Sequence, residues 1–217
     1  MSLIPLDEKT IWTNAKVNTV FTASANEKPL NTYYTMQDIL DTVADEGVAG
    51  LFAQTGNSTI ITGTIAETTL INGGVGTLTI PANGFQVGDS FRAIFGGVMN
   101  AANNQTIRVR VKAGPITLLD SGVQALTNSI VDDIWSLNID FTIRQIGGAG
   151  VASIVSLGAF HYIKTSNAST QGFAFNVVNN TTFNTTISND LNVTVQWGST
   201  NAGNSIYSDI FVLNKTY

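Results

Sequence analysis

The chain has no cysteine and a single histidine, His161, among its 217 residues. Without cysteine it has no disulfide scaffold and no thiol nucleophile. One histidine with no cysteine also excludes a usual zinc site, whose ligands are mostly nitrogen and sulfur. His161 lies in an alternating, strand-like segment, where a hydrogen-bonded or partly exposed ring is far commoner than a catalytic base.

Charge is also scarce, since charged residues make up 12% of the chain and the net charge is −5. Residues 1–49 hold three lysines against seven acidic residues, a balance of −4, so the rest of the chain is close to −1. Such a chain lacks the basic footprint of nucleic-acid binding. No apolar run approaches the roughly 18 residues of a membrane span, and no basic-then-apolar leader is visible. We expect a protein made in a cytoplasm, with neither nucleic acid nor membrane among its partners.

Apolar and polar residues alternate most regularly along residues 134–144. The apolar positions are Trp135, Leu137, Ile139, Phe141 and Ile143. Successive side chains of a strand point to opposite faces, so this pattern predicts a long antiparallel strand with one face in a core.

Similar segments follow one another from about residue 58, separated by turns rich in glycine and asparagine. The predicted strands are residues 58–62, 64–71, 75–80, 90–98, 105–112, 116–119, 134–146, 151–163, 172–178, 184–187, 190–197 and 205–213. Many short strands without intervening helices predict an all-β, antiparallel, jelly-roll-like β-sandwich over residues 51–217.

Residues 1–50 form a separate part with a different pattern. Residues 1–34 show no sustained period, and we expect an extended arm that orders on a partner, with a frayed terminus as the alternative. A sequence like a capping box at Thr35–Asp38 and a glycine at Gly47 predict one short helix between them. A helix of about three turns is marginal alone, so it must pack on something. The residues expected to make attachment or oligomer contacts are Trp12, Met36, Ile39, Leu40 and Val43.

Some strands have apolar residues on both faces. Residues 210–213 are four consecutive apolar residues, and residues 154–157 are similar. In a two-layer sandwich the outer face is usually polar, so a second apolar face indicates cover by the helix and arm or burial in an oligomer. We favour an oligomer, with Ile210 and Val212 on its buried face.

The acidic residues of the body offer two further possibilities. Asp132 and Asp133, with Asn128 and Asp120 near them in sequence, carry oxygen ligands suited to calcium, but their spacing matches no EF-hand or calcium repeat. Glycoside cleavage takes two opposed carboxylates, and no pair here is set against another. We predict that the protein is not an enzyme and has no catalytic, cofactor-binding or metal site.

Residues 106–112 form a basic strand, in which alternation places Arg108, Arg110 and Lys112 on one face. These cations hold a sulfated or acidic glycan, pair with an acidic neighbour, or form a solvated face that discourages edge aggregation. Exposed tyrosines are further candidates for stacking on sugar rings. They are Tyr33, Tyr34, Tyr207 and Tyr217.

Two successive segments, Gly76–Arg92 and Gln105–Lys112, resemble part of a jelly-roll domain of bacteriophage virion proteins. The aromatic strand at residues 134–144 and the segment Leu191–Trp197 are similar to it as well. The resemblance covers roughly residues 60–217, and its motifs mark strands and turns, not a site. It implies a homotrimer of the head-fibre, capsid-decoration or tail-fibre type, without catalytic residues.

The sequence hypothesis is therefore a phage virion structural protein that forms a trimeric surface projection, either a head fibre or a capsid decoration. Residues 1–50 would dock it on other capsid or tail proteins, and its location would be the virion. The alternative is a glycan- or receptor-binding module of a tail fibre, since a fold does not set a function. That alternative requires exposed aromatic residues gathered beside asparagine or aspartate at a loop end.

Overall fold

The computed structural model describes residues 50–126, 129–165 and 168–217, all of which belong to one compact unit, Gly47–Tyr217. The arm and short helix expected within residues 1–49 lie outside the described residues. So do the contact residues predicted there, which are Trp12, Met36, Ile39, Leu40 and Val43.

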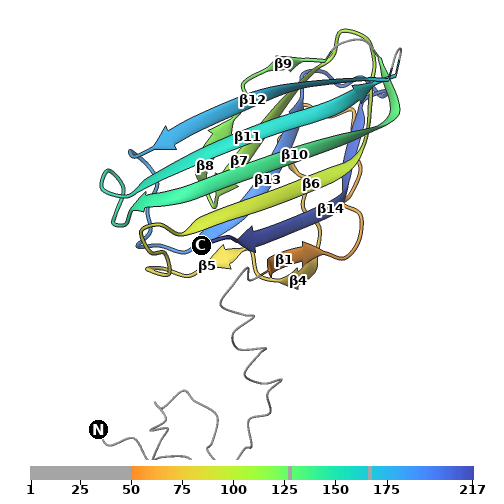
Figure 1. Ribbon diagram of the computed structural model, residues 1–217. Coiled ribbons are helices and arrows are strands. Elements are labelled where there is room, and N and C mark those ends of the chain that lie inside the picture. The colour runs from red at the N-terminus through yellow and green to blue at the C-terminus, as the bar shows by residue number, and fades with distance from the viewer. Residues whose placement is uncertain (1–49, 127–128, 166–167) are drawn as a thin grey trace, which may run out of the picture. The chain divides into compact units, whose positions relative to one another are not determined.

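The described strands form two antiparallel sheets that share one hydrophobic core (Figure 1). The large sheet has the order β12 (Ser169–Asn179), β11 (Ser153–Lys164), β10 (Ile130–Gln145), β6 (Ser90–Ala101), β14 (Ser205–Lys215), β1 (Gly50–Gln54) and β4 (Gly74–Gly76), and β2 (Ile61–Thr62) also pairs with β14. The small sheet has the order β3 (Thr68–Thr69), β13 (Asn189–Trp197), β7 (Thr106–Ala113) and β8 (Ile116–Asp120), with β5 (Thr79–Ile80) on β13 and β9 (Gln124–Ala125) on β7.

The strand pairing is that of a jelly roll. Taking β1, β3, β6, β7, β8, β10, β13 and β14 as its eight strands, the first pairs with the last, the second with the seventh, the third with the sixth and the fourth with the fifth. A long hairpin folded over on itself gives this nested pattern. Strands β11 and β12 extend the large sheet beyond β10. The predicted jelly-roll-like β-sandwich is therefore confirmed.

Strand β10 contains the alternating residues 134–144. Its five apolar positions are all buried in the core, and they are Trp135, Leu137, Ile139, Phe141 and Ile143. Aromatic rings from neighbouring strands pack beside them. The Trp135 and Phe160 rings stack with centroids 5.5 Å apart, and those of Phe95 and Phe211 with centroids 3.9 Å apart. Stacked aromatic pairs add to the stabilisation from burial alone, so this layer anchors the large sheet.

Several strand predictions differ from the structure. The predicted strands 58–62, 64–71 and 75–80 are strands only at residues 61–62, 68–69, 74–76 and 79–80, and β9 was not predicted. Residues 184–187 form no strand, because side chains take up the backbone groups that a strand would use. Asn184 Oδ1 accepts from the Thr186 amide at 2.9 Å, and Asn189 Nδ2 donates to the carbonyls of Asn184 at 2.9 Å and Ile187 at 2.8 Å. Strand β1 was missed, because five residues are too few for a clear alternation.

Residues 210–213 of β14 are buried on one face only. Phe211 and Leu213 are buried in the core, whereas Ile210 is exposed and Val212 half-buried on the outer side. A bulge between Ser208 and Ile210 shifts the register with β6. The four apolar residues in a row are therefore an ordinary alternation between a core face and an apolar outer face.

Gly97 of β6 allows the backbone of β14 to approach closely beside this bulge. The Trp135 indole on β10 reaches across β6, and its Nε1 donates to the Tyr207 carbonyl of β14 at 3.1 Å. A β-carbon at Gly97 would lie 2.1 Å from that same carbonyl oxygen. A residue without a side chain is needed where another strand comes this close.

Candidate functional surfaces

The basic strand β7 alternates as its sequence predicts. Ile107, Val109 and Val111 are fully buried, which leaves the three basic side chains on the outer face of the small sheet. These are Arg108, Arg110 and Lys112. Each of them has a carboxylate neighbour, so the possibility that they pair with acidic residues is the one the structure shows.

Asp120 on β8 is the first of these acidic partners. The Arg108 guanidinium donates to both of its oxygens, with the Nε contact at 2.8 Å. Arg110 Nε lies 3.4 Å from Asp120 Oδ2, and the Gly122 amide donates to Oδ1 at 2.9 Å. The hydrogen bonds from Arg108 outweigh partial burial and lower the pKa of Asp120 from 3.8 to about 2.

Glu67, between β2 and β3, is the second partner. Its carboxylate accepts from Arg110 Nη1 at 3.0 Å, Lys112 Nζ at 3.1 Å and Thr194 Oγ1 at 2.8 Å. Burial alone would raise its pKa, but the hydrogen bonds from Thr194 and Lys112 and the charge of Arg110 lower it overall. Glu67 therefore stays ionised at neutral pH and holds the β7 cations to the neighbouring strand segment.

The outer face of the small sheet is thus a closed network of charges and amides. Three cations meet two carboxylates, and Arg110 Nη2 also donates to Gln196 Oε1 at 3.0 Å. A hollow of about 250 Å³ lies beside Arg108. Its only aromatic lining residue, Trp197, is buried, so the hollow does not offer an exposed ring for a sugar to stack on.

The remaining candidate residues are dispersed. Asp132 accepts a hydrogen bond from Asn100 at 2.9 Å and Asp133 one from Thr165, both on the large sheet, whereas Asp120 lies on the small sheet. Asn128 lies outside the described residues. Within the described part of the chain, no group of three or more such side chains is placed to hold a metal ion.

The aromatic and histidine candidates do not form a cluster either. Tyr207 lies near the start of β14, and Tyr217 follows the other end of the same strand. Tyr33 and Tyr34 fall outside the described residues. His161 is exposed on the outer face of β11, opposite Gly172 of β12. Among the described residues, the arrangement required by the glycan-binding alternative is not present.

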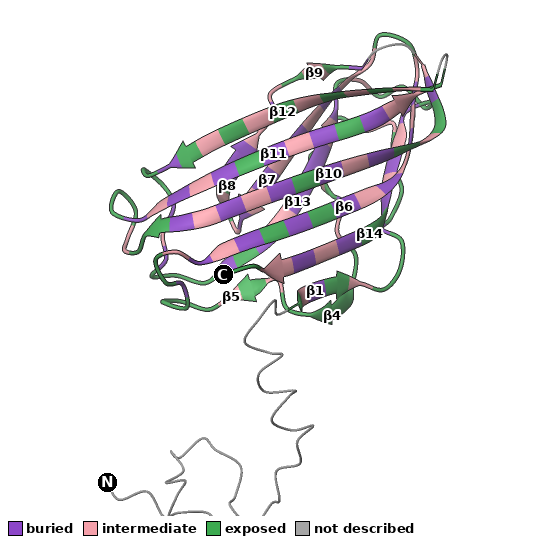
Figure 2. Cartoon of the chain, viewed as in Figure 1, coloured by how far each residue is buried: buried purple, intermediate pink, exposed green. Residues whose placement is uncertain are grey.

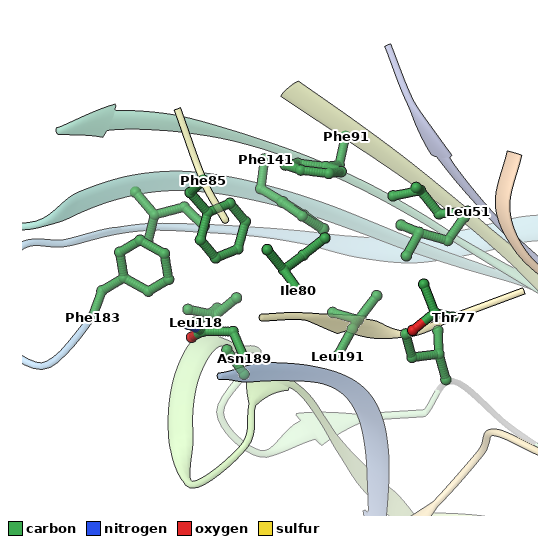
Figure 3. A pocket seen from close by; sticks show the side chains of 14 residues that line it. Leu51, Thr77, Ile80, Phe85, Phe91, Leu118, Phe141, Phe183, Asn189 and Leu191 are labelled. Carbon is green, nitrogen blue, oxygen red and sulfur yellow. The ribbon is translucent and has the colours of Figure 1, made fainter. Parts of the chain in front are cut away.

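A cavity of about 30 Å³ remains at one end of the core, between the two sheets (Figure 3). Its lining is apolar except for Thr77 and Asn189, and Asn189 Oδ1 has no hydrogen-bond partner among the described residues. This space holds roughly one or two water molecules, so it is a packing defect of the core and not a pocket for a larger ligand.

The large sheet has a different kind of outer face. Strands β12, β11, β10, β6 and β14 lie side by side. Exposed or half-buried positions alternate with buried ones along β11, β10, β6 and β14, and exposed positions alternate with half-buried ones along β12 (Figure 2). We call their outward side chains the apolar outer face. Its exposed large members are Ile134 (65% exposed), Ile210 (57%), Leu157 (53%), Val178 (51%) and Ile94 (40%).

Both apolar and polar side chains lie between these residues. Val155, Ile163, Val98, Tyr207 and Val212 are half-buried, Ala159 contributes only a methyl group and Gly96 no side chain, and Ser136, Asn138 and Thr142 of β10 are polar. The exposed pair Arg92 and Asp140 joins β6 to β10 at 2.7 Å. Ile210 and Val212 thus belong to one extended apolar surface, and their place in an oligomer stays a prediction.

The comparisons with known proteins add no family to this description. No protein-family model matches the chain, and no curated protein sequence matches it either. Within the described residues, no helix has the length and apolar character needed to cross a bilayer.

Proposed function

We propose that this protein is a structural component of a bacteriophage virion that forms a trimeric surface projection, a head fibre or capsid decoration. In this proposal the jelly-roll body is the projecting part. Residues 1–50 attach it to other capsid or tail proteins of the particle. The resemblance of Gly76–Arg92 and Gln105–Lys112 to virion jelly-roll domains supports this class, and so does the jelly-roll pairing of the strands.

The apolar outer face is the observation that carries the proposal. Exposed apolar patches on a single folded chain rarely exceed a few hundred square ångströms unless they serve an interaction. Here exposed apolar side chains occur on each strand from β12 to β14, while the opposite outer face has its charges paired with one another. A body whose small-sheet charges are paired with one another, and whose large sheet exposes apolar side chains, is suited to assembly.

Immunogold electron microscopy tests the proposal. Antibodies raised against residues 50–217 should label purified particles of the phage that encodes the chain at regular positions on the head or tail. Mass spectrometry of the same particles should find the protein at a fixed copy number relative to the major capsid protein. Particles that lack the protein, while the infected-cell lysate contains it, would rule the proposal out.

A truncated chain lacking residues 1–49 tests the attachment role of that region. It should retain the far-ultraviolet circular dichroism of a β-sandwich, because the core described above lies within residues 50–217. When it replaces the full chain during infection, we expect it to stay in the soluble fraction and not to join particles. Normal incorporation of a folded truncated chain would contradict the attachment role while leaving the virion assignment intact.

A further inference from the structure

We infer that the apolar outer face is where copies of this chain associate with one another. The inference rests on the proposed function, in which the projection is trimeric, and it assigns the surface through which that assembly forms. The occupant of the face is a second copy of the chain. If residues 1–49 or a different protein cover the face instead, the purified full chain should be a monomer in the experiment below, and the inference fails.

The size of the face fits a stable association. Five adjacent strands spaced about 4.8 Å apart, with about ten residues each at about 3.3 Å, present roughly 800 Å². A standard specific interface buries about 800 Å² on each partner, which equals the area of this whole face, so each of its two flanks supplies about half of that.

The charge of the face suits contact between identical chains. Like charges brought together on two copies would repel, and an unpaired charge buried in the contact would be costly. Along the middle of the face the charges of Arg92 and Asp140 are paired within the chain, 2.7 Å apart, whereas Asp209 beside Ile210 and Arg144 near the end of β10 are exposed and form no ion pair among the described residues. The other outward positions of β10 and β11 include small, amide and hydroxyl side chains, such as Ala159, Asn138 and Thr142, and the exposed ring of His161.

The distribution of large side chains also suits a three-fold arrangement. A cyclic trimer joins two different patches of each copy, so that a ring of three closes. The apolar outer face provides such patches at its two flanks, one around Leu157 and Val178 on β11 and β12, and one around Ile94 and Ile210 on β6 and β14. The β12 edge adds to the first flank, since no described strand pairs with its free side and it contains neither charged residues nor proline.

The test compares the native mass of the full chain with that of two double variants by sedimentation equilibrium over a range of concentrations. Ile134→Glu/Ile210→Glu places charges on the apolar outer face. Ile65→Glu/Val123→Glu is the matched control, because those side chains are 56% and 67% exposed and lie beside the small-sheet hollow. All three proteins should give the same circular dichroism spectrum, since each changed side chain is largely outside the core.

We expect the full chain and the control to sediment as an oligomer, with three copies of 23.0 kDa for the proposed trimer. The face variant should associate at least about a hundredfold more weakly, which corresponds to a loss of about 2.8 kcal/mol. A monomeric full chain, or a face variant with an unchanged oligomer, would overturn the inference. The proposed function can fail separately. If the face variant dissociates but the protein is missing from particles, the interface is upheld and only the proposed virion role is refuted.

A second measurement covers the possibility that the face variant fails to fold. Because the chain has no cysteine, Leu157→Cys and Val123→Cys each introduce a unique thiol at an exposed apolar position. At concentrations where the oligomer forms, a maleimide should label Leu157→Cys at least about tenfold more slowly than Val123→Cys, because burial blocks the thiolate. On dilution to the monomer the two rates should converge. Equal rates at all concentrations would place the face outside the contact and refute the inference.

Discussion

In both sheets of this jelly roll, alternating side chains pack into the shared core. The outer faces of the two sheets differ. On the small sheet, Arg108, Arg110 and Lys112 are held by Asp120 and Glu67, so the charges are satisfied within one chain. On the large sheet, outward isoleucines, leucine and valines remain exposed from β12 to β14. The outer face of the small sheet has its charges paired within the chain. Covering the apolar side chains of the large sheet would lower the free energy, because it removes them from water.

This difference shows where the molecule can be altered without loss of its fold. Changes to the small-sheet network affect the stability of the single chain, because the partners come from β7, β8 and the segment before β3. In the proposed oligomer, changes to outward side chains of the large sheet should affect association and leave the core intact. Single substitutions on either sheet can test this separation.

Gly97→Ala should cost at least about 3 kcal/mol of unfolding free energy, because main chain cannot yield easily to a new methyl group. The added β-carbon would lie 2.1 Å from the Tyr207 carbonyl oxygen, at the bulge that orients Ile210. Chemical denaturation measures the loss. Gly96→Ala is the control, because its β-carbon would have an ordinary contact of 3.5 Å, and equal losses in the two variants would contradict this account.

Arg110→Met should lower the unfolding free energy by about 2–3 kcal/mol, because hydrogen bonds to charged groups are worth more than neutral ones. Arg110 is the most buried cation of the network and contacts Glu67, Asp120 and Gln196. The more exposed Lys112, replaced in Lys112→Met, should give a smaller loss by the same denaturation assay. A larger loss for Lys112→Met than for Arg110→Met would show that the more buried cation does not contribute more to the unfolding free energy.

Asp120→Asn should cost about 1–2 kcal/mol at pH 7 and nothing near pH 1. The folded pKa of Asp120, about 2, lies below its ordinary value of 3.8. The stability contributed by the carboxylate is therefore fully present above about pH 4 and is lost as the pH falls through about 2. Denaturation curves of both proteins at pH 7, 4, 3 and 2 should converge toward acid, and a difference that does not change with pH would contradict this.

Asp140→Asn should change the stability of the single chain by no more than about 0.5 kcal/mol, because exposed ion pairs contribute little. The side chains of Arg92 and Asp140 are 57% and 47% exposed on the apolar outer face. In the proposed oligomer the substitution leaves Arg92 as an unpaired charge in the contact, so association should weaken while the unfolding free energy of the single chain stays nearly constant. Native mass and denaturation, measured on the same samples, separate the two effects. A large loss of single-chain stability would mean that this pair acts within the fold.

Much of the sheet structure could be predicted from alternation. β10 and β7 are long enough for the period of two to be unmistakable, and both place their apolar positions in the core. Residues 184–187 have the polar, threonine-rich composition of an edge strand, but Asn184 and Asn189 satisfy the local backbone instead. β3 and β4 are only two and three residues long, so the pattern that predicted strands over residues 64–71 and 75–80 does not show where pairing begins and ends.

The candidate surfaces divide in the same way. The sequence shows that Arg108, Arg110 and Lys112 share a face, since that follows from period two alone. It does not show that Glu67, more than forty residues earlier, lies between Arg110 and Lys112. A pairing over that distance depends on the register between β3, β13 and β7. The sequence could therefore list three uses for the basic strand but could not choose among them.

The amino-acid sequence alone determined the all-β class, the positions of the long strands and the face on which each side chain lies, because these depend on local alternation and turn residues. The tertiary structure decided which strands are neighbours, that the basic face is neutralised within the chain, and that isolated apolar positions such as Ile94 and Ile210 belong to one continuous surface. These properties depend on strand order, which is set by contacts between residues far apart in the chain and is not written in any local pattern.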